Sequence, residues 1–125
     1  MEINIPEVHA DVVSAFERYE VALGENDLDV LRELFWASDM TLRYGPAEIL
    51  CGAEAIHAFR AARPNVPRPR TLFATAITTF GTDFAVANTQ YRNQGSERAG
   101  RQSQTWVRMA EGWRIVSAHV SFLED

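Results

Sequence analysis

Lysine is absent from the 125 residues, and all twelve positive charges are arginines. This absence excludes a Schiff-base lysine and a lysine general base. Every cationic contact therefore depends on the planar guanidinium group, whose paired N–H donors match the geometry of a carboxylate. The formal net charge of −5 argues against a nucleic-acid-binding protein, because phosphate contacts require a basic surface.

Cysteine is almost absent as well. Cys51 is the only one, which excludes an internal disulfide and a zinc site built from several thiolates. The three histidines and seventeen acidic residues show no HExxH or related ligand spacing, and the sequence has no glycine-rich phosphate loop. We therefore expect neither a metal nor another cofactor.

Long hydrophobic runs are missing too. No stretch approaches the roughly 20 apolar residues that cross a bilayer, and residues 1–6 have neither the basic start nor the apolar run of a signal peptide. We expect a cytoplasmic protein that does not bind membranes. With 46% hydrophobic and 23% charged residues and no linker or repeat, the chain is predicted to form one globular domain over residues 1–125.

Helices are predicted in the first half of the chain, where apolar residues recur at intervals of three and four. Pro6 suits a first helical turn and Gly24 a helix end, while Asp27 is the expected cap of the next helix. Pro64 ends the third. The expected helices span residues 6–23, 28–36 and 53–63.

Strands are predicted between the second and third helices and throughout the second half. The short ones form a hairpin at Gly45-Pro46, and the long ones follow each other as an antiparallel meander. The expected strands span residues 41–44, 48–51, 70–80, 84–92, 101–109 and 113–122. Helices separated from antiparallel strands predict an α+β fold rather than a parallel α/β sheet.

The last hairpin suggests an interface. If Met109 pairs with Trp113, then Met109, Val107, Trp113 and Ile115 share one face of the sheet, and the other face is also partly apolar. A sheet that is apolar on both faces requires two covers. We therefore expect a homodimer formed through the face turned away from the first helix.

The order of these elements resembles the nuclear transport factor 2-like fold, also called cystatin-like or SnoaL-like. Five segments are similar to the oxalurate-catabolism protein family (HpxZ type, also called AtzH-like), so that the resemblance extends over essentially the whole chain. They are residues 1–4 (MEIN), 41–45 (TLRYG), 59–64 (FRAARP), 100–106 (GRQSQTW) and 113–121 (WRIVSAHVS).

The resemblance implies a cone-shaped curved antiparallel sheet wrapped round three helices, with an internal pocket. It implies that the pocket binds a small ureido carboxylate of purine breakdown, with conversion by a metal-independent lyase or hydrolytic step left open. The alternative is a non-catalytic accessory protein that binds a pathway amidase. Position 57 departs from the resemblance, because a histidine stands where arginine is expected.

Arg60 is the foremost candidate for binding such an anion. It follows Ile56 by four residues and therefore lies on the predicted buried stripe of the third helix, together with Arg63. A buried guanidinium must be paired, because an isolated buried charge costs several kcal/mol. A ligand carboxylate and an internal salt bridge with Glu48 or Glu54 are both compatible with the sequence.

Amide and aromatic side chains complete the candidate site. Gln102 and Gln104 share a strand face with Trp106, and their amides suit a ureido group, although backbone groups of the sheet are alternative partners. Tyr44 and His57 are candidate proton carriers. The predicted ligand-binding residues are Tyr44, His57, Arg60, Arg63, Arg70, Tyr91, Gln102, Gln104 and Trp106.

Overall fold

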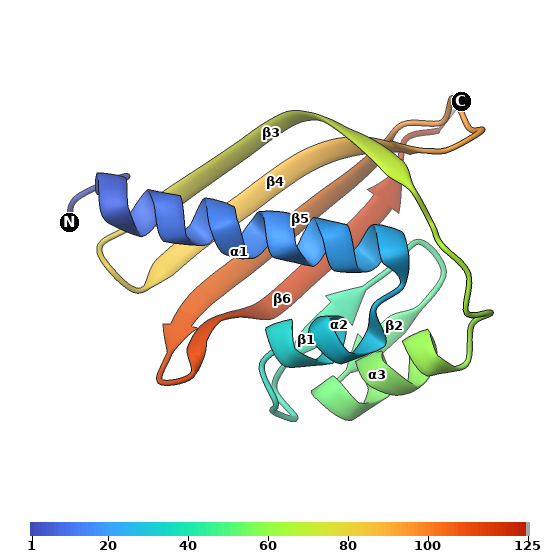
Figure 1. Cartoon of the computed structure of the whole chain (residues 1–125), viewed down its shortest axis with the longest axis horizontal. Helices are drawn as coiled ribbons and strands as arrows, with labels where there is room; N and C mark the ends of the chain where they lie inside the picture. Colours follow the sequence, from blue (N-terminus) through green and yellow to red (C-terminus); the bar gives the residue numbers. More distant parts are fainter. Residues whose placement is uncertain (125) are drawn as a thin grey trace.

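In the computed structural model, which describes residues 1–124, three helices and six strands form an α+β fold (Figure 1). The helices are α1 (Pro6–Glu25), α2 (Leu28–Leu34) and α3 (Ala53–Ala61). The strands are β1 (Leu42–Tyr44), β2 (Ile49–Cys51), β3 (Arg70–Phe80), β4 (Phe84–Asn93), β5 (Gly100–Met109) and β6 (Gly112–Phe122). Every predicted element is present, and the boundaries differ by at most a few residues. None of the helices in residues 1–124 is both long and apolar enough to cross a membrane.

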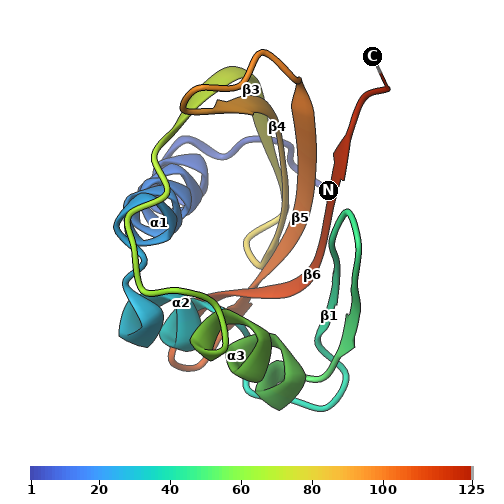
Figure 2. The same cartoon turned by 90° about the vertical axis from the view of Figure 1, so that its right-hand side faces the viewer.

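The strands form one sheet in the order β2-β1-β6-β5-β4-β3. Neighbouring strands are antiparallel except β1 and β6, which are parallel, with Leu42 opposite Ser117. The predicted α+β fold with a curved sheet is confirmed, and the sheet is mixed because the short hairpin joins the antiparallel meander through one parallel pair. Figure 2 shows the sheet curving around α1, with α2 and α3 below it.

The helix boundaries follow from local chemistry. Pro6 occupies the first turn of α1, and Asn26 ends the helix in the left-handed conformation, with φ of 58°. The Asp27 side chain accepts a hydrogen bond from the Val30 N–H at 3.2 Å, as expected for an N-cap. Helix α3 ends at Ala61, before the predicted Arg63.

Two irregularities in the strands shape the sheet. In β3, Ala74 has φ of 53° where the register with β4 shifts, and such bulges bend a strand. In β5 and β6, the register shifts between Thr105, opposite Ser117, and Trp106, opposite Ile115, so that Val116 is an extra residue. Because of this shift, residues 113–115 of β6 point to the face of the sheet opposite to the one predicted.

Trp113 and Ile115 are consequently buried in the core, with 8% and 0% of their surface exposed. Their predicted role in a dimer interface was wrong, because the bulge turns them inward. Beyond it the predicted register holds: Ser103 lies opposite His119 and Gln102 opposite Val120.

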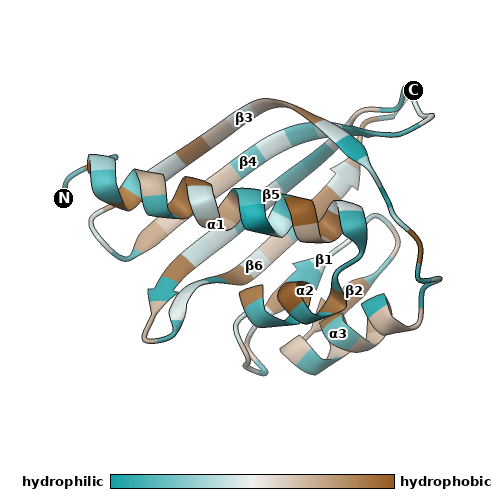
Figure 3. Cartoon of the chain, in the orientation of Figure 1, coloured by the Kyte–Doolittle hydropathy of each residue, from teal (hydrophilic) through white to brown (hydrophobic). Residues whose placement is uncertain are grey.

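The core lies between α1 and the concave face of the sheet. Figure 3 shows hydrophobic and hydrophilic bands alternating along α1, as expected for an amphipathic helix. The buried residues of α1 pack with Leu31, Phe35, Ile56 and the inward side chains of β4, β5 and β6. Trp106 is completely buried at the centre of this core.

Candidate functional site

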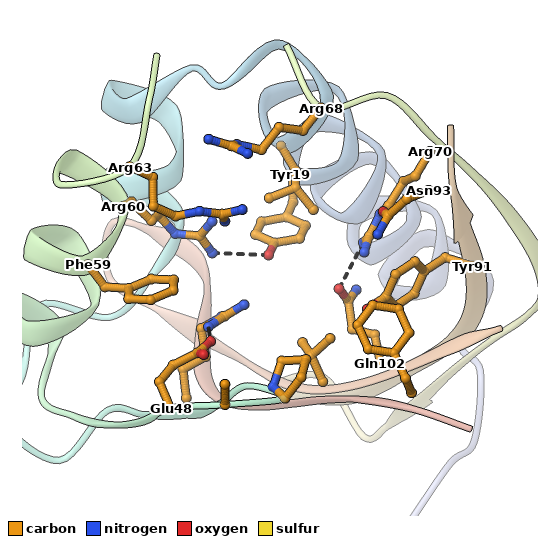
Figure 4. A pocket seen from close by; sticks show the side chains of 16 residues that line it. Tyr19, Glu48, Phe59, Arg60, Arg63, Arg68, Arg70, Tyr91, Asn93 and Gln102 are labelled. Carbon is orange, nitrogen blue, oxygen red and sulfur yellow. Dashed lines mark hydrogen bonds and ion pairs between the residues drawn. The ribbon is translucent and has the colours of Figure 1, made fainter. Parts of the chain in front are cut away.

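A cavity of about 350 Å³ opens where the last turns of α1 face the hairpin β1–β2, helix α3 and one end of the sheet (Figure 4). Its wall is polar and rich in arginine. The lining residues are Tyr19, Leu23, Arg43, Pro46, Ala47, Glu48, Phe59, Arg60, Arg63, Arg68, Arg70, Tyr91, Asn93, Gln102, Val120 and Phe122.

Arg70 is neutralised within the protein. Its guanidinium donates to both carboxylate oxygens of Glu20, with the shortest distance 2.7 Å, and to Gln102 Oε1 at 2.8 Å. Gln102 also donates through Nε2 to Glu20 Oε1 at 3.2 Å, so that both ends of its amide are engaged. Arg70 and Gln102 line the cavity while bonded to each other and to Glu20, and their roles as direct ligand contacts stay predictions. The triad fixes the cavity wall.

Tyr91 lies against this triad. Its buried ring stacks on the Arg70 guanidinium at 4.3 Å and contacts the Phe122 ring, with 5.8 Å between the ring centroids. Gly100 lies directly beneath the ring, and a β-carbon at this position would overlap it. Burial raises the pKa of the Tyr91 hydroxyl, and the positive charge of Arg70 opposes this rise. Tyr91 is thus a neutral part of the wall at physiological pH.

Arg43 has a carboxylate partner as well. Its Nη1 donates to Glu48 Oε1 at 2.9 Å, and the two side chains are only 11% and 20% exposed. The pair comes from the two sides of the β1–β2 hairpin. Unlike Glu20, Glu48 itself lines the cavity.

Arg60, on helix α3, also lines the cavity and is 6% exposed. Its Nη2 donates to the Tyr19 hydroxyl oxygen at 3.3 Å, its charge lies 5.5 Å from the Phe35 ring centroid, and its buried Nε has no hydrogen-bond partner. Within residues 1–124 no carboxylate lies within salt-bridge distance of Arg60.

The salt-bridge alternative for Arg60 is therefore wrong. Glu48 is paired with Arg43, and Glu54 is paired with Arg32 at 2.9 Å on the exposed surface. The guanidinium of Arg60 is held by a tyrosine and an aromatic face, which leaves its charge uncompensated by the described residues.

Arg63 and Arg68 add further positive charge at the cavity entrance. Burial lowers the pKa of the Arg63 guanidinium, and the nearby charges of Arg68, Arg43 and Arg60 act in the same direction. Neither Arg63 nor Arg68 has a salt-bridge partner among residues 1–124. Together with Arg60 they give the cavity wall an excess of positive charge, which favours an anion.

Tyr19 is the hydroxyl group closest to this charge. It is 2% exposed, lines the cavity and accepts the hydrogen bond from Arg60. None of the hydrogen bonds found in residues 1–124 uses its hydroxyl proton, which is available to a ligand. No local pattern points to this role, because a tyrosine fits the apolar stripe of α1 as well as other core residues do.

Of the nine predicted residues, the structure brings Arg60, Arg63, Arg70, Tyr91 and Gln102 together around the cavity. Tyr44 lies on the opposite face of the sheet, 41% exposed, with its ring 5.7 Å from that of His119. The prediction that Tyr44 reaches inward was wrong, because the side chains of a strand alternate and it is Arg43 that faces the cavity.

His57, Gln104 and Trp106 also lie outside the cavity wall. His57 lines a separate recess with Arg32, where burial lowers the pKa of its imidazole and the charge of Arg32 acts in the same direction. Gln104 and Trp106 are buried deeper in the cone and bond to each other, Nε1 of the indole donating to Oε1 of the amide at 3.0 Å.

Sequence reasoning missed five lining residues of chemical interest: Tyr19, Arg43, Glu48, Arg68 and Asn93. An available signal was the alternation in residues 41–44, which places Arg43 and Tyr44 on opposite faces.

No group of three or more His, Cys, Asp or Glu side chains arranged to hold a metal ion occurs in residues 1–124.

Solved structures with similar sequences share the whole fold. A protein of unknown function from Pectobacterium atrosepticum is 55% identical, with a TM-score of 0.94, over 98% of this chain and 95% of that one. A cystatin-like fold protein from Burkholderia xenovorans is 47% identical, also with a TM-score of 0.94, over 100% of this chain and 98% of that one.

A more distant structure extends the fold assignment. A nuclear transport factor 2-like protein of unknown function from Pseudomonas putida is 16% identical, with a TM-score of 0.80, over 95% of this chain and 89% of that one. These likenesses confirm the predicted fold. No protein of curated function matches the chain. The family model described as AtzH-like matches residues 1–125.

Proposed function

Because the chain belongs to the AtzH-like family, we propose that its arginine-lined cavity binds a small ureido carboxylate of the oxalurate type. The observation that carries this proposal is Arg60, a guanidinium that is 6% exposed and has no carboxylate partner among residues 1–124. A buried charge without a counter-charge costs several kcal/mol. A ligand carboxylate would supply the missing partner.

The other groups near Arg60 favour the same ligand class. Arg63 and Arg68 add positive charge, while Tyr19 offers a hydroxyl proton to a carboxylate or carbonyl oxygen. The volume of about 350 Å³ lies at the lower end of the range of roughly 300–1,000 Å³ for small-molecule sites. A ureido acid has a planar carboxylate for the arginines and N–H groups for a hydrogen-bond acceptor.

If the protein converts its ligand, Tyr19 is the residue placed to move a proton, in place of the predicted Tyr44 and His57. A general acid must lie within hydrogen-bond reach of the reacting group. The Tyr19 hydroxyl lines the cavity and accepts a hydrogen bond from Arg60 Nη2 at 3.3 Å. This arrangement supports a metal-independent lyase or hydrolytic step.

Isothermal titration calorimetry tests the proposal. We expect oxalurate and other ureido carboxylates to bind with one site per chain, and neutral ureas of the same size to bind far more weakly. Incubation of oxalurate with the protein, followed by chromatography of the products, tests conversion. Failure of every small carboxylate to bind would refute the proposal.

A non-catalytic accessory role is the second candidate. It is favoured by the lack of a paired nucleophile and base among the cavity residues described in 1–124. In this case the chain would bind a cytoplasmic amidase of the same pathway, and substitution of Tyr19 by Phe would leave the amidase activity unchanged. Loss of product formation in Tyr19→Phe would instead support a catalytic role.

A further inference from the structure

Glu48 sets the cavity apart from a simple cationic pocket. Among the lining residues in 1–124 it carries the only carboxylate. Glu20 neutralises Arg70 from behind the wall, whereas Glu48 presents its charge to whatever occupies the cavity. A ligand held by the arginines must therefore also be compatible with a negative charge at the hairpin.

The Glu48 side chain is fixed in this position. It folds back over Gly45, where a β-carbon would overlap the carboxylate, and it is 20% exposed. Oε1 accepts a hydrogen bond from Arg43 at 2.9 Å, and no hydrogen bond to Oε2 occurs within residues 1–124. Because a carboxylate can accept about four hydrogen bonds, Glu48 keeps spare acceptor capacity beside the cavity.

Other acceptors in the wall are less suitable. Gln102 Oε1 already accepts from Arg70, and Gln104, which was predicted to hold the ureido group, lies outside the cavity. Asn93 lines the cavity but is an exposed residue. The carboxylate of Glu48 is the acceptor best placed to meet an N–H donor.

We propose that Glu48 is the specificity-determining residue of this site: it accepts an N–H group of the ligand while the arginines bind the ligand carboxylate. The inference rests on the proposed function and adds the recognition of the second end of the ligand. If the ligand has a methyl or methylene group at that end, Glu48 keeps only its hydrogen bond with Arg43 within residues 1–124. If the ligand has a second carboxylate there, the two negative charges repel each other.

Four probes of the same skeleton separate these cases: hydantoate, with a ureido group; succinamate, with a terminal amide; levulinate, with no N–H; and succinate, with a second carboxylate. We expect hydantoate and succinamate to bind to the wild-type protein about tenfold or more tightly than levulinate, the effect of one charge-assisted hydrogen bond. Succinate should bind more weakly than succinamate.

Two variants test the assignment to Glu48. Glu48→Gln keeps the shape but removes the charge, and it should reduce the preference for hydantoate over levulinate to about a third, because hydrogen bonds to charged groups are roughly twice as strong. It should also strengthen succinate binding. Gly45→Ala displaces the carboxylate, because only the flexible end of the Glu48 side chain has to move. It should lower the same preference without unfolding the protein.

The matched control is Glu54→Gln, which removes the same charge from an exposed pair with Arg32. It should leave all four affinities unchanged. If the wild-type protein binds hydantoate and levulinate equally, or if Glu48→Gln weakens all four probes by the same factor, Glu48 only holds Arg43 and our inference is wrong. If none of the four probes binds, the proposed anion site itself is refuted.

Discussion

Replacement of Arg60 by methionine gives the most direct test of the site. Within residues 1–124 the guanidinium has one hydrogen bond, to Tyr19, and one aromatic contact, to Phe35. These contribute about 1 kcal/mol and roughly 0.5–2 kcal/mol, respectively. The removed charge is 6% exposed and has no counter-charge among residues 1–124, so that its loss relieves a desolvation cost of several kcal/mol.

We therefore expect Arg60→Met to have an unfolding free energy equal to or slightly above that of the wild type. Binding should behave differently. Two charge-assisted hydrogen bonds to a carboxylate contribute about 1.5–3 kcal/mol each, so the variant should lose at least 100-fold in affinity for hydantoate. Arg60→Lys keeps the charge but not the paired donors, and should lose about 1–3 kcal/mol.

Urea denaturation and calorimetric titration on the same samples measure both quantities. Arg32→Met, which removes an arginine from an exposed pair, is the control and should bind hydantoate normally. If Arg60→Met is destabilised by several kcal/mol while Arg60→Lys binds normally, Arg60 is a structural residue and the proposed site is incorrect.

Three further predictions follow from other parts of the structure. Gly100→Ala should lose about 1–3 kcal/mol of stability, because its β-carbon displaces the Tyr91 ring, whereas Gly24→Ala, with open space around it, should lose none; equal melting temperatures of the two variants would contradict this packing. The lowered pKa of His57 means that its contribution to stability is present above the ordinary histidine value of about 6.5 and declines as the pH falls below it. Urea midpoints at pH 7.5 and 5.5 should therefore differ more in the wild type than in His57→Gln, and an identical difference would exclude this role. We also propose a homodimer through the outer sheet face, where Phe84 is 54% exposed, and sedimentation of a monomer at tens of micromolar would refute it.

The elements of the fold could be predicted because each has a local cause. Helical spacing, Asp27 at a cap and the glycine and proline turns all act within a few residues, and the structure confirms the strands from Arg70 onward to within one residue. The facing of Trp113 could not be predicted, because one bulge residue shifts the register. Nothing in the alternation of apolar residues shows where a bulge occurs.

The site was predictable where a charge interrupts an apolar pattern. Arg60 was found because a charge on a buried helix stripe requires a partner. Tyr19 was missed because a tyrosine fits the apolar stripe of α1 without needing a charged partner. Its hydroxyl becomes a candidate ligand contact only because Arg60 lies beside it. Gln104 was misplaced because strand alternation gives the face of a residue but not its depth within the cone.

The parallel pairing of β1 with β6 affects how the site assembles. The hairpin that carries Arg43 and Glu48 is joined to the sheet by three residue pairs, each linking positions far apart in the sequence. The meander from β3 to β6 is built from neighbouring strands and has far more local contacts, which form faster. We therefore expect this wall of the cavity to form late in folding and to open by local unfolding while the core remains intact. We expect the backbone amides of Leu42–Tyr44 to exchange with solvent sooner than those of β5. Because this hairpin carries Arg43 and Glu48, which line the cavity, a bound ligand should slow the exchange of these amides.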